Sequence, residues 1–398
     1  MNEAEVFRPS RRSVLGVGAA GLLASVLPTA ARAGDWGQID STLENLVWDR
    51  HTPSIAVAIA RDGVIVHSRY IGTANLETGT PCSAASIYRI GSVSKQFTAA
   101  GLLLLQEDGK LSLDDPLSRY MPDFPRANEI TLRQMATHTS GLGNYTDTET
   151  PQEFLQRSRM DLDDPALLEW LRESDPLYTS EPGTEWAYSN TAYVLLGMIM
   201  TQVSGMEYGD FLNSRLFAPY DLRQTSVDNA ATVVRDRVNG YTPAPSSPTG
   251  FANASFISMM IPGAAGAMTS SVTDLCHWHQ LLMAGKILKP DSFQQFTTSG
   301  RLSNGALPMR GSGADATPIN YGLGVNVGEG DYGRIISHGG GIQGFISRLA
   351  SYPDAGLSIA MTTNCDPGIV DPNVRLPEGM SAAQTSFEER VKAIRSAA

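Results

Sequence analysis

The separation of its strand-like segments is the feature that most constrains this fold: they lie near the two ends of the chain, with helical patterns between them. Near the N-terminus, two apolar runs at 54–60 and 64–71 flank Asp62-Gly63, which favours the positive φ angles of a hairpin turn. Three further strands are expected near the other end, at 333–337, 344–352 and 356–363. Strands contributed by such distant segments predict one antiparallel sheet with a helical lobe inserted into it.

Apolar residues spaced three or four apart predict helices elsewhere in the chain. The expected helices are 35–50, 97–106, 165–171, 192–203, 272–283 and 380–398. The last of them is expected to cover one face of the sheet. The sequence therefore predicts an α/β (α+β) fold in which the sheet part spans about 34–96 and 255–398 and the helical lobe spans about 97–254.

The first 33 residues have the regions of a secretory signal in order. Ser10-Arg11-Arg12 precedes an apolar stretch from Val14 to Leu27, and Ala31-Arg32-Ala33 offers small residues for cleavage. The paired arginines resemble a twin-arginine export signal, and the apolar run is too short to cross a bilayer of about 30 Å. We expect residues 1–33 to be removed, leaving 34–398 as a periplasmic or secreted protein without an integral membrane span. An ordinary N-terminal anchor is the alternative.

Composition excludes several classes of function. A net charge of -11 argues against nucleic acid as a partner, because phosphate binding needs a basic face. Three cysteines allow at most one disulfide bond and no Cys-rich metal site. The one close histidine pair, His277 and His279, would point to different faces of a helix, so no metal site is expected.

The candidate chemistry begins at Ser92 and Lys95, where a helical pattern starts. Lysine is scarce in this chain, and Lys95 is the one lysine that has a serine three positions before it. Residues i and i+3 share a helix face, so the serine hydroxyl can reach the lysine amine. Burial would lower the pKa of that amine and make it a base for the serine. The alternative is a serine N-cap followed by a solvated lysine.

Two later segments extend this pattern. Tyr188 and Asn190 lie two positions apart, and 337–341 reads Ser-His-Gly-Gly-Gly after a predicted strand. In this order the three segments resemble the Ser-x-x-Lys, Tyr-x-Asn and Lys/His-x-Gly motifs of the serine β-lactamase and penicillin-binding protein superfamily, specifically its class C-like branch of DD-peptidases, D-aminopeptidases and esterases. The resemblance extends over about 36–364, and segments 131–142, 182–183 and 321–324 agree with it. It implies a β-lactamase/transpeptidase-like fold.

The resemblance also implies roles for individual residues. Ser92 would be the acylated nucleophile, Lys95 its proton partner, and Tyr188 the phenol that passes the proton to the leaving group. A nearby cation would lower the pKa of Tyr188. Asn190 would hold a substrate amide and the Lys95 amine.

The third motif would supply the other side of the cleft. His338 would line it as a hydrogen-bond donor, and Gly340 would let the strand approach the substrate. The backbone N–H of Gly341, with that of Ser92, would form the oxyanion hole. His138 lies outside the three motifs and is expected to be structural.

The resemblance implies an exported serine hydrolase that forms an acyl-enzyme on Ser92 without a metal or organic cofactor. The expected substrates are short peptides with D- or other unusual residues, such as peptidoglycan fragments or linearised cyclic peptides. Gly339 replaces the threonine that helps many relatives bind a substrate carboxylate, which disfavours penicillin hydrolysis and strict carboxypeptidase action. The alternatives are a carboxylesterase or weak β-lactamase with the same site, or a non-catalytic penicillin-recognising sensor protein.

Overall fold

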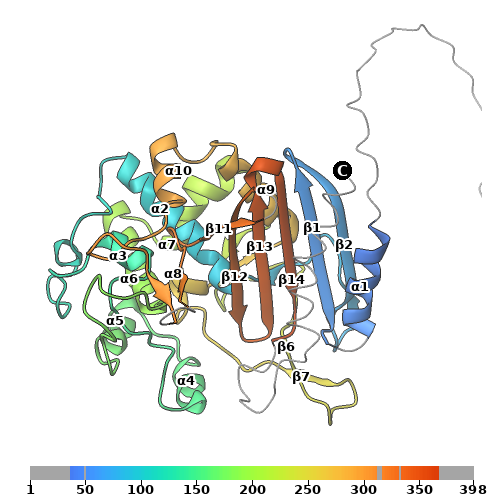
Figure 1. Cartoon of the computed structure of the whole chain (residues 1–398). Coiled ribbons are helices and arrows are strands. Elements are labelled where there is room, and N and C mark those ends of the chain that lie inside the picture. The colour runs from blue at the N-terminus through green and yellow to red at the C-terminus, as the bar shows by residue number, and fades with distance from the viewer. Residues whose placement is uncertain (1–35, 49–50, 312–315, 331–332, 367–398) are drawn as a thin grey trace, which may run out of the picture.

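The computed structural model of the 398-residue chain describes residues 36–48, 51–311, 316–330 and 333–366 (Figure 1). The signal segment predicted at 1–33 and the terminal helix predicted at 380–398 lie outside the described residues. Among the helices that are described, none is long and apolar enough to cross a membrane.

A seven-stranded sheet in the order β11-β12-β13-β14-β1-β2-β3 forms one side of the molecule (Figure 1). Its strands are β1 (Ser54–Arg61), β2 (Val64–Asn75), β3 (Thr80–Pro81), β11 (Asn326–Gly330), β12 (Gly333–Ile342), β13 (Phe345–Tyr352) and β14 (Leu357–Thr363). β1 pairs antiparallel with both β2 and β14, so segments some 300 positions apart share one sheet. This confirms the predicted antiparallel sheet, and Asp62 and Gly63 take φ angles of 50° and 83° in the hairpin turn.

The strand that ends at Ser337 in the sequence prediction continues to Ile342 in the structure. Gly339, Gly340 and Gly341 pair with residues of β13. Glycine has a low strand propensity, so the sequence did not predict that the strand continues through these three positions. The third motif therefore lies within β12. β11 pairs with β12 only as far as Ser337, so it leaves the glycine-rich end of β12 without β11 beside it.

The two faces of β1 carry different side chains. Ile55, Val57 and Ile59 pack with Leu43 of α1 (Gly37–Trp48) on one face. Alanines occupy the other face, where they let α9 (Val272–Met283) approach so closely that the Cys276 thiol bonds the Ala58 carbonyl at 3.2 Å. The alternation of large aliphatic side chains with alanines along β1 thus determines which helix covers each side of the sheet.

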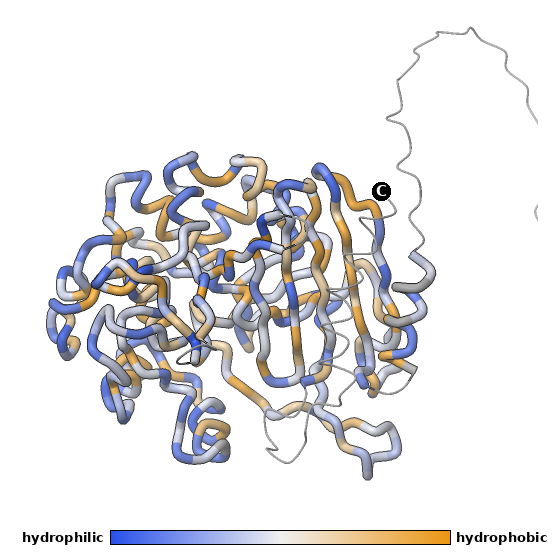
Figure 2. The backbone as a smooth tube through the Cα atoms, in the orientation of Figure 1, coloured by the Kyte–Doolittle hydropathy of each residue, from blue (hydrophilic) through white to orange (hydrophobic). Residues whose placement is uncertain are grey.

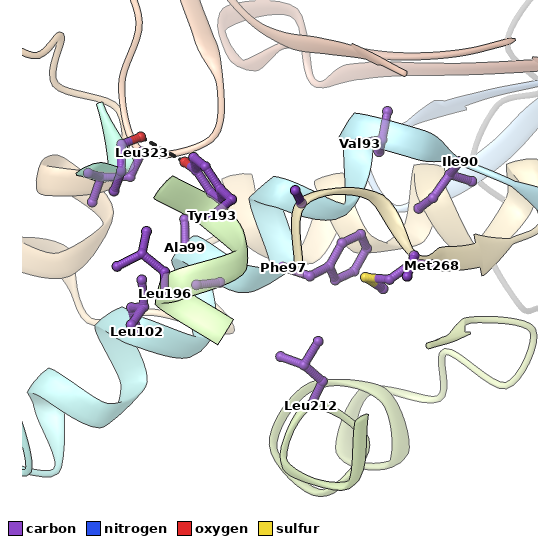
Figure 3. Close-up of a cluster of buried hydrophobic side chains, with 14 of the residues drawn as sticks. Ile90, Val93, Phe97, Ala99, Leu102, Tyr193, Leu196, Leu212, Met268 and Leu323 are labelled. Carbon is purple, nitrogen blue, oxygen red and sulfur yellow. Dashed lines mark hydrogen bonds between the residues drawn. The ribbon is translucent and has the colours of Figure 1, made fainter. Parts of the chain in front are cut away.

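The helical lobe lies beside the sheet and is built around one buried helix. Its helices are α2 (Ser94–Glu107), α3 (Leu132–Ala136), α4 (Pro151–Arg157), α5 (Asp164–Arg172), α6 (Asn190–Ser204), α7 (Tyr208–Leu212), α8 (Gly263–Gly266) and α10 (Pro290–Phe296). Nearly every residue of α2 is buried. Figure 3 shows its Phe97 beside Met268, and Tyr193 and Leu196 of α6 near its Ala99 and Leu102. Figure 2 shows hydrophobic segments along the sheet and hydrophilic ones over the outer loops of the lobe.

Short strands tie the segment before α2 to the lobe. β4 (Tyr88–Arg89) and β5 (Ser226–Val227) pair with the two sides of β8 (Met268–Ser270). The remaining short strands are β6 (Tyr241–Pro243), β7 (Phe251–Asn253), β9 (Met309–Arg310) and β10 (Thr317–Pro318). Immediately after β4 comes the 3-10 turn η1 (Gly91–Val93), which carries Ser92 to the junction of lobe and sheet.

Candidate active site

Ser92 lies in the 3-10 turn η1, where the sequence pattern predicted the first turn of an α-helix. Gly91 takes a φ of 48°, and the Ser94 hydroxyl bonds the Gly91 carbonyl at 2.6 Å, so the chain turns sharply before α2 begins. The turn leaves Ser92 partly exposed while Gly91 and Val93 on either side are buried. Ser92 and Lys95 still meet, because the lysine follows at the start of α2.

The glycines of β12 pack directly against this turn. A Cβ on Gly340 would lie 2.0 Å from the Ile90 carbonyl oxygen, and one on Gly91 would lie 2.9 Å from the backbone of Gly341. Gly340 was predicted to let the strand approach the substrate, and in the structure the absence of a Cβ there also makes room for the contact between β12 and Ile90. Two backbones that touch in this way hold Ser92 and Gly341 beside each other.

The Lys95 amine is surrounded by three oxygen atoms. Its Nζ lies 3.1 Å from Ser92 Oγ, 2.7 Å from Asn190 Oδ1 and 2.8 Å from the Ala265 carbonyl oxygen. The two carbonyl oxygens can only accept, so they take two hydrogens of the amine. A neutral amine then has its lone pair left for the proton of Ser92.

Burial shifts the pKa values of the two ionisable side chains beside Ser92. It holds the pKa of Lys95 well below its ordinary value and raises the pKa of Tyr188 above that of a free phenol, with a hydrogen bond from Ser92 as the smaller, opposing effect. Lys95 Nζ lies 4.8 Å from the centre of the Tyr188 ring. The prediction that a cation lowers the Tyr188 pKa is therefore wrong for the resting state, because burial disfavours both the ammonium and the phenolate.

The start of α6 brings Asn190 to the site. Ser189 caps the helix by accepting a hydrogen bond from the Ala192 N–H, and its hydroxyl also bonds the Gly143 carbonyl at 2.8 Å. The Asn144 side chain accepts the backbone N–H of Asn190 at 3.1 Å. The loop at 143–144 thus orients the amide that holds Lys95.

His338 was expected to donate into the cleft, but both its ring nitrogens are already bonded. Nδ1 lies 2.5 Å from the Gly339 carbonyl oxygen, which can only accept, and Nε2 lies 2.8 Å from the Tyr321 hydroxyl. Nδ1 must therefore carry the proton, and Nε2 accepts from Tyr321. Burial lowers the pKa of His338 to about 3. The imidazole is neutral and has no free donor, which corrects the predicted role.

His138, expected to be structural, is fully buried beneath the site. Its Nδ1 accepts the backbone N–H of Ser189 at 3.2 Å, and its ring lies 4.3 Å from that of Tyr188. Burial holds its pKa well below the ordinary value. The ring thus supports both the cap of α6 and the phenol beside Ser92.

A cavity of about 200 Å³ opens beside Ser92. Its walls come from η1, the end of β12, α8 with the segment before it, the loop 145–146, and the helices α4 and α6. Its lining residues are Gly91, Ser92, Tyr145, Thr146, Phe154, Asn190, Ile257, Pro262, Ala265, Gly266, Gly341, Ile342 and Gln343. The sequence motifs do not include Tyr145, Phe154, Ile257 or Gln343. Only Gln343 had a local signal, since it is the one polar side chain in the stretch 339–345.

In the described part of the chain, no group of three or more histidine, cysteine or acidic residues is arranged to hold a metal ion. His279 is a buried core residue that bonds Ser351 and Gln96, as expected for packing. Cys82, Cys276 and Cys365 are free, buried thiols.

Comparison with known proteins agrees with this geometry. The family model described as Beta-lactamase matches residues 39–384. Penicillin-binding protein 4* of Bacillus subtilis (strain 168) is 29% identical over 325 residues, which are 79% of this chain and 68% of that protein.

Two solved structures are similar to this chain in three dimensions as well as in sequence. A D-stereospecific amidohydrolase from Streptomyces sp. superimposes with a TM-score of 0.68 at 29% identity, over 83% of this chain and 95% of that one. The D-amino acid amidase from Ochrobactrum anthropi SV3 gives a TM-score of 0.68 at 25% identity, over 87% of this chain and 99% of that one.

Proposed function

The chain belongs to the beta-lactamase family of serine hydrolases, and on that premise we propose that it cleaves amide bonds of short peptides through an acyl-enzyme on Ser92. One observation carries the proposal. Two carbonyl oxygens take the hydrogens of the buried Lys95 amine, so its lone pair faces the Ser92 hydroxyl 3.1 Å away. A base in that geometry activates serine for attack on a carbonyl carbon.

In the proposed acylation step, Ser92 Oγ forms a bond to the substrate carbonyl carbon while its proton passes to Lys95 Nζ. The C=O electron pair moves onto oxygen, where the backbone N–H groups of Ser92 and Gly341 receive the charge. When the C–N bond breaks, the Tyr188 phenol protonates the leaving amine and takes a proton back from Lys95.

Deacylation reverses these roles with water as the nucleophile. A water molecule gives a proton to Lys95 and Tyr188, which act together as the base, and its oxygen bonds the acyl carbon. The ester bond then breaks, the acid leaves, and Ser92 regains its proton. His338 has no part in this scheme, because Tyr321 occupies its Nε2 and the Gly339 carbonyl oxygen occupies its Nδ1.

The substrate class rests on the relatives and on the cleft. Two similar structures are described as a D-stereospecific amidohydrolase and a D-amino acid amidase. The neutral His338 offers no positive charge to a substrate carboxylate, which argues against penicillins and free C-terminal carboxylates. We therefore propose amides with D- or other unusual residues as substrates, ahead of β-lactams.

The mechanism is tested with an active-site label. A fluorophosphonate should modify the wild-type protein at Ser92, located by peptide mass spectrometry, and should leave Ser92→Ala unlabelled. Turnover of D- and L-peptides is then compared with that of p-nitrophenyl esters. Hydrolysis of esters alone would replace the amidase proposal with a carboxylesterase, and unchanged activity in Ser92→Ala would overturn the mechanism.

We also propose export through the segment 1–33. The support is the paired Arg11-Arg12 ahead of a short apolar run. Expressed with its own N-terminus, the protein should accumulate outside the cytoplasm with residues 1–33 removed. Replacing both arginines by lysine should retain it inside, and unchanged export of that variant would exclude the twin-arginine route.

A further inference from the structure

Gln343 is a buried polar side chain that lines the cleft beside Ser92 and has no partner there. It follows β12 directly, and only 4% of its surface is exposed. Its Nε2 is buried without a hydrogen-bond partner, and the carboxamide forms no other hydrogen bond with the residues that the structure describes. Buried polar groups are almost always bonded, so an unpartnered one that also lines the cleft calls for an explanation such as a bound ligand.

The backbone next to Gln343 is firmly held. The N–H of Gly344 donates to the Asp366 carboxylate at 2.6 Å, and Gly344 takes a φ of 81°. A Cβ on Gly344 would lie 2.5 Å from the Cα of Gly240, so the two chains are in direct contact. These contacts fix the backbone from which the Gln343 side chain extends at the edge of the cleft.

The side chains around Gln343 set the chemistry of what it can bind. Tyr145, Phe154, Ile257 and Ile342 make the cavity walls largely apolar. Of the described residues that line the cavity, none is acidic or basic. A free ammonium group buried here would have no counter-charge, whereas a neutral amide would lose little and could pair with the carboxamide.

Building on the function proposed above, we propose that Gln343 is the specificity-determining residue of the cleft. Its carboxamide hydrogen bonds the acylamino group next to the scissile carbonyl, while the apolar walls take the neighbouring side chain. The enzyme thereby selects substrates whose amino group is already acylated, as within a peptide, over amides of free amino acids.

Three amides that differ only at this group test the proposal: N-acetyl-phenylalanine amide, phenylalanine amide and 3-phenylpropanamide, the first two in both D and L forms. The wild-type kcat/KM should be highest for the acetylated compound of the preferred hand. Gln343→Met keeps the length of the side chain and removes its hydrogen bonds. It should lower kcat/KM about tenfold for the acetylated compound and less than about twofold for 3-phenylpropanamide.

A second variant reverses the selection. Gln343→Glu supplies a carboxylate, so it should raise kcat/KM for phenylalanine amide, measured at a pH at which the amine of this substrate is protonated. The same variant should lower kcat/KM for the acetylated compound.

Thr362→Val is the matched control, because the Thr362 hydroxyl is also buried without a partner but lies on β14 and does not line the cavity. Both Thr362→Val and Gln343→Met should keep or raise Tm, and Thr362→Val should leave all three rates unchanged.

An unchanged preference for the acetylated amide in Gln343→Met, within about twofold, would overturn the inference. So would an equal loss on all three amides, since that indicates a general structural defect. Fluorophosphonate labelling of Ser92 and hydrolysis of p-nitrophenyl acetate do not require Gln343. If these also fail in the wild-type protein, the proposed function itself is wrong, and the two failures are told apart.

Discussion

The Ser347 hydroxyl on β13 donates a 2.7 Å hydrogen bond to the carbonyl oxygen of Ile90, two residues before Ser92. Gly340 on the neighbouring strand leaves the space that this carbonyl occupies. This hydrogen bond and the close contacts of Gly340 and Gly341 with the turn hold Ser92 against the sheet. Residues remote from the reacting atoms can in this way control the position of the Ser92 hydroxyl.

We expect Gly340→Ala to damage this junction more than Ser347→Ala. The added methyl group would lie 2.0 Å from the Ile90 oxygen, and such overpacking costs about 1–3 kcal/mol. Loss of the Ser347 bond should cost about 1 kcal/mol, because the Ile90 oxygen keeps the Val93 N–H at 3.2 Å. Urea unfolding measures both, and kcat/KM should fall further in Gly340→Ala. An alanine at 340 without effect would mean that the contact is not needed.

The buried Lys95 predicts a rate that rises with pH. Acylation needs the neutral amine, and burial lowers the pKa of Lys95 from its ordinary value of 10.5. The log of kcat/KM should therefore climb with pH and level off below the pH at which an exposed lysine would titrate. Lys95→Ala should lower the acylation rate by about 10²–10⁴ and remove this limb of the profile. A pH-independent wild-type rate would exclude Lys95 as the base.

Tyr188→Phe removes only the phenol oxygen and keeps the ring against His138. The acylation rate on an amide should fall by about 10²–10⁴, while Tm changes little because the packing is retained. An ester with a good leaving group needs less help from an acid, so the loss on p-nitrophenyl acetate should be smaller. A loss below about tenfold on the amide would place the proton donor elsewhere.

His338 should make the fold sensitive to acid. Its folded pKa of about 3 lies below the ordinary 6.5, so between these values the unfolded chain binds the extra proton. The free energy of unfolding must then fall as pH falls through this window, by about 1.4 kcal/mol per pH unit at full slope. His338→Gln should reduce the loss between pH 6.5 and 4.5 by up to about 2.7 kcal/mol in urea titrations. An identical loss in the variant would show that this histidine titrates normally.

The three cysteines should be inert in the folded protein. Burial raises the pKa of the Cys276 thiol to about 12, and the thiols of Cys82 and Cys365 are shifted upward for the same reason. A thiol reagent at pH 8 should therefore modify none of them before unfolding and all three in urea. Rapid reaction of the native protein would contradict the buried, free state of these residues.

The sequence by itself determined the strands at both ends, the hairpin at Asp62-Gly63 and the pairing of Ser92 with Lys95. These features are local, since they depend on alternation, turn chemistry and a spacing of three residues. A segment such as 333–337 was predicted too short because propensity does not register strand partners supplied by another segment.

Only the tertiary structure decided how the site is charged and what it can bind. Burial by segments far away in sequence lowers the pKa of both Lys95 and His338, and the carbonyl that completes the lysine site belongs to Ala265. The role proposed for Gln343 depends on two features of the folded protein: its Nε2 is buried without a hydrogen-bond partner, and the cavity that it lines has no charged side chain. Desolvation and satisfied hydrogen bonds are properties of a packed environment, and no pattern along the chain contains them.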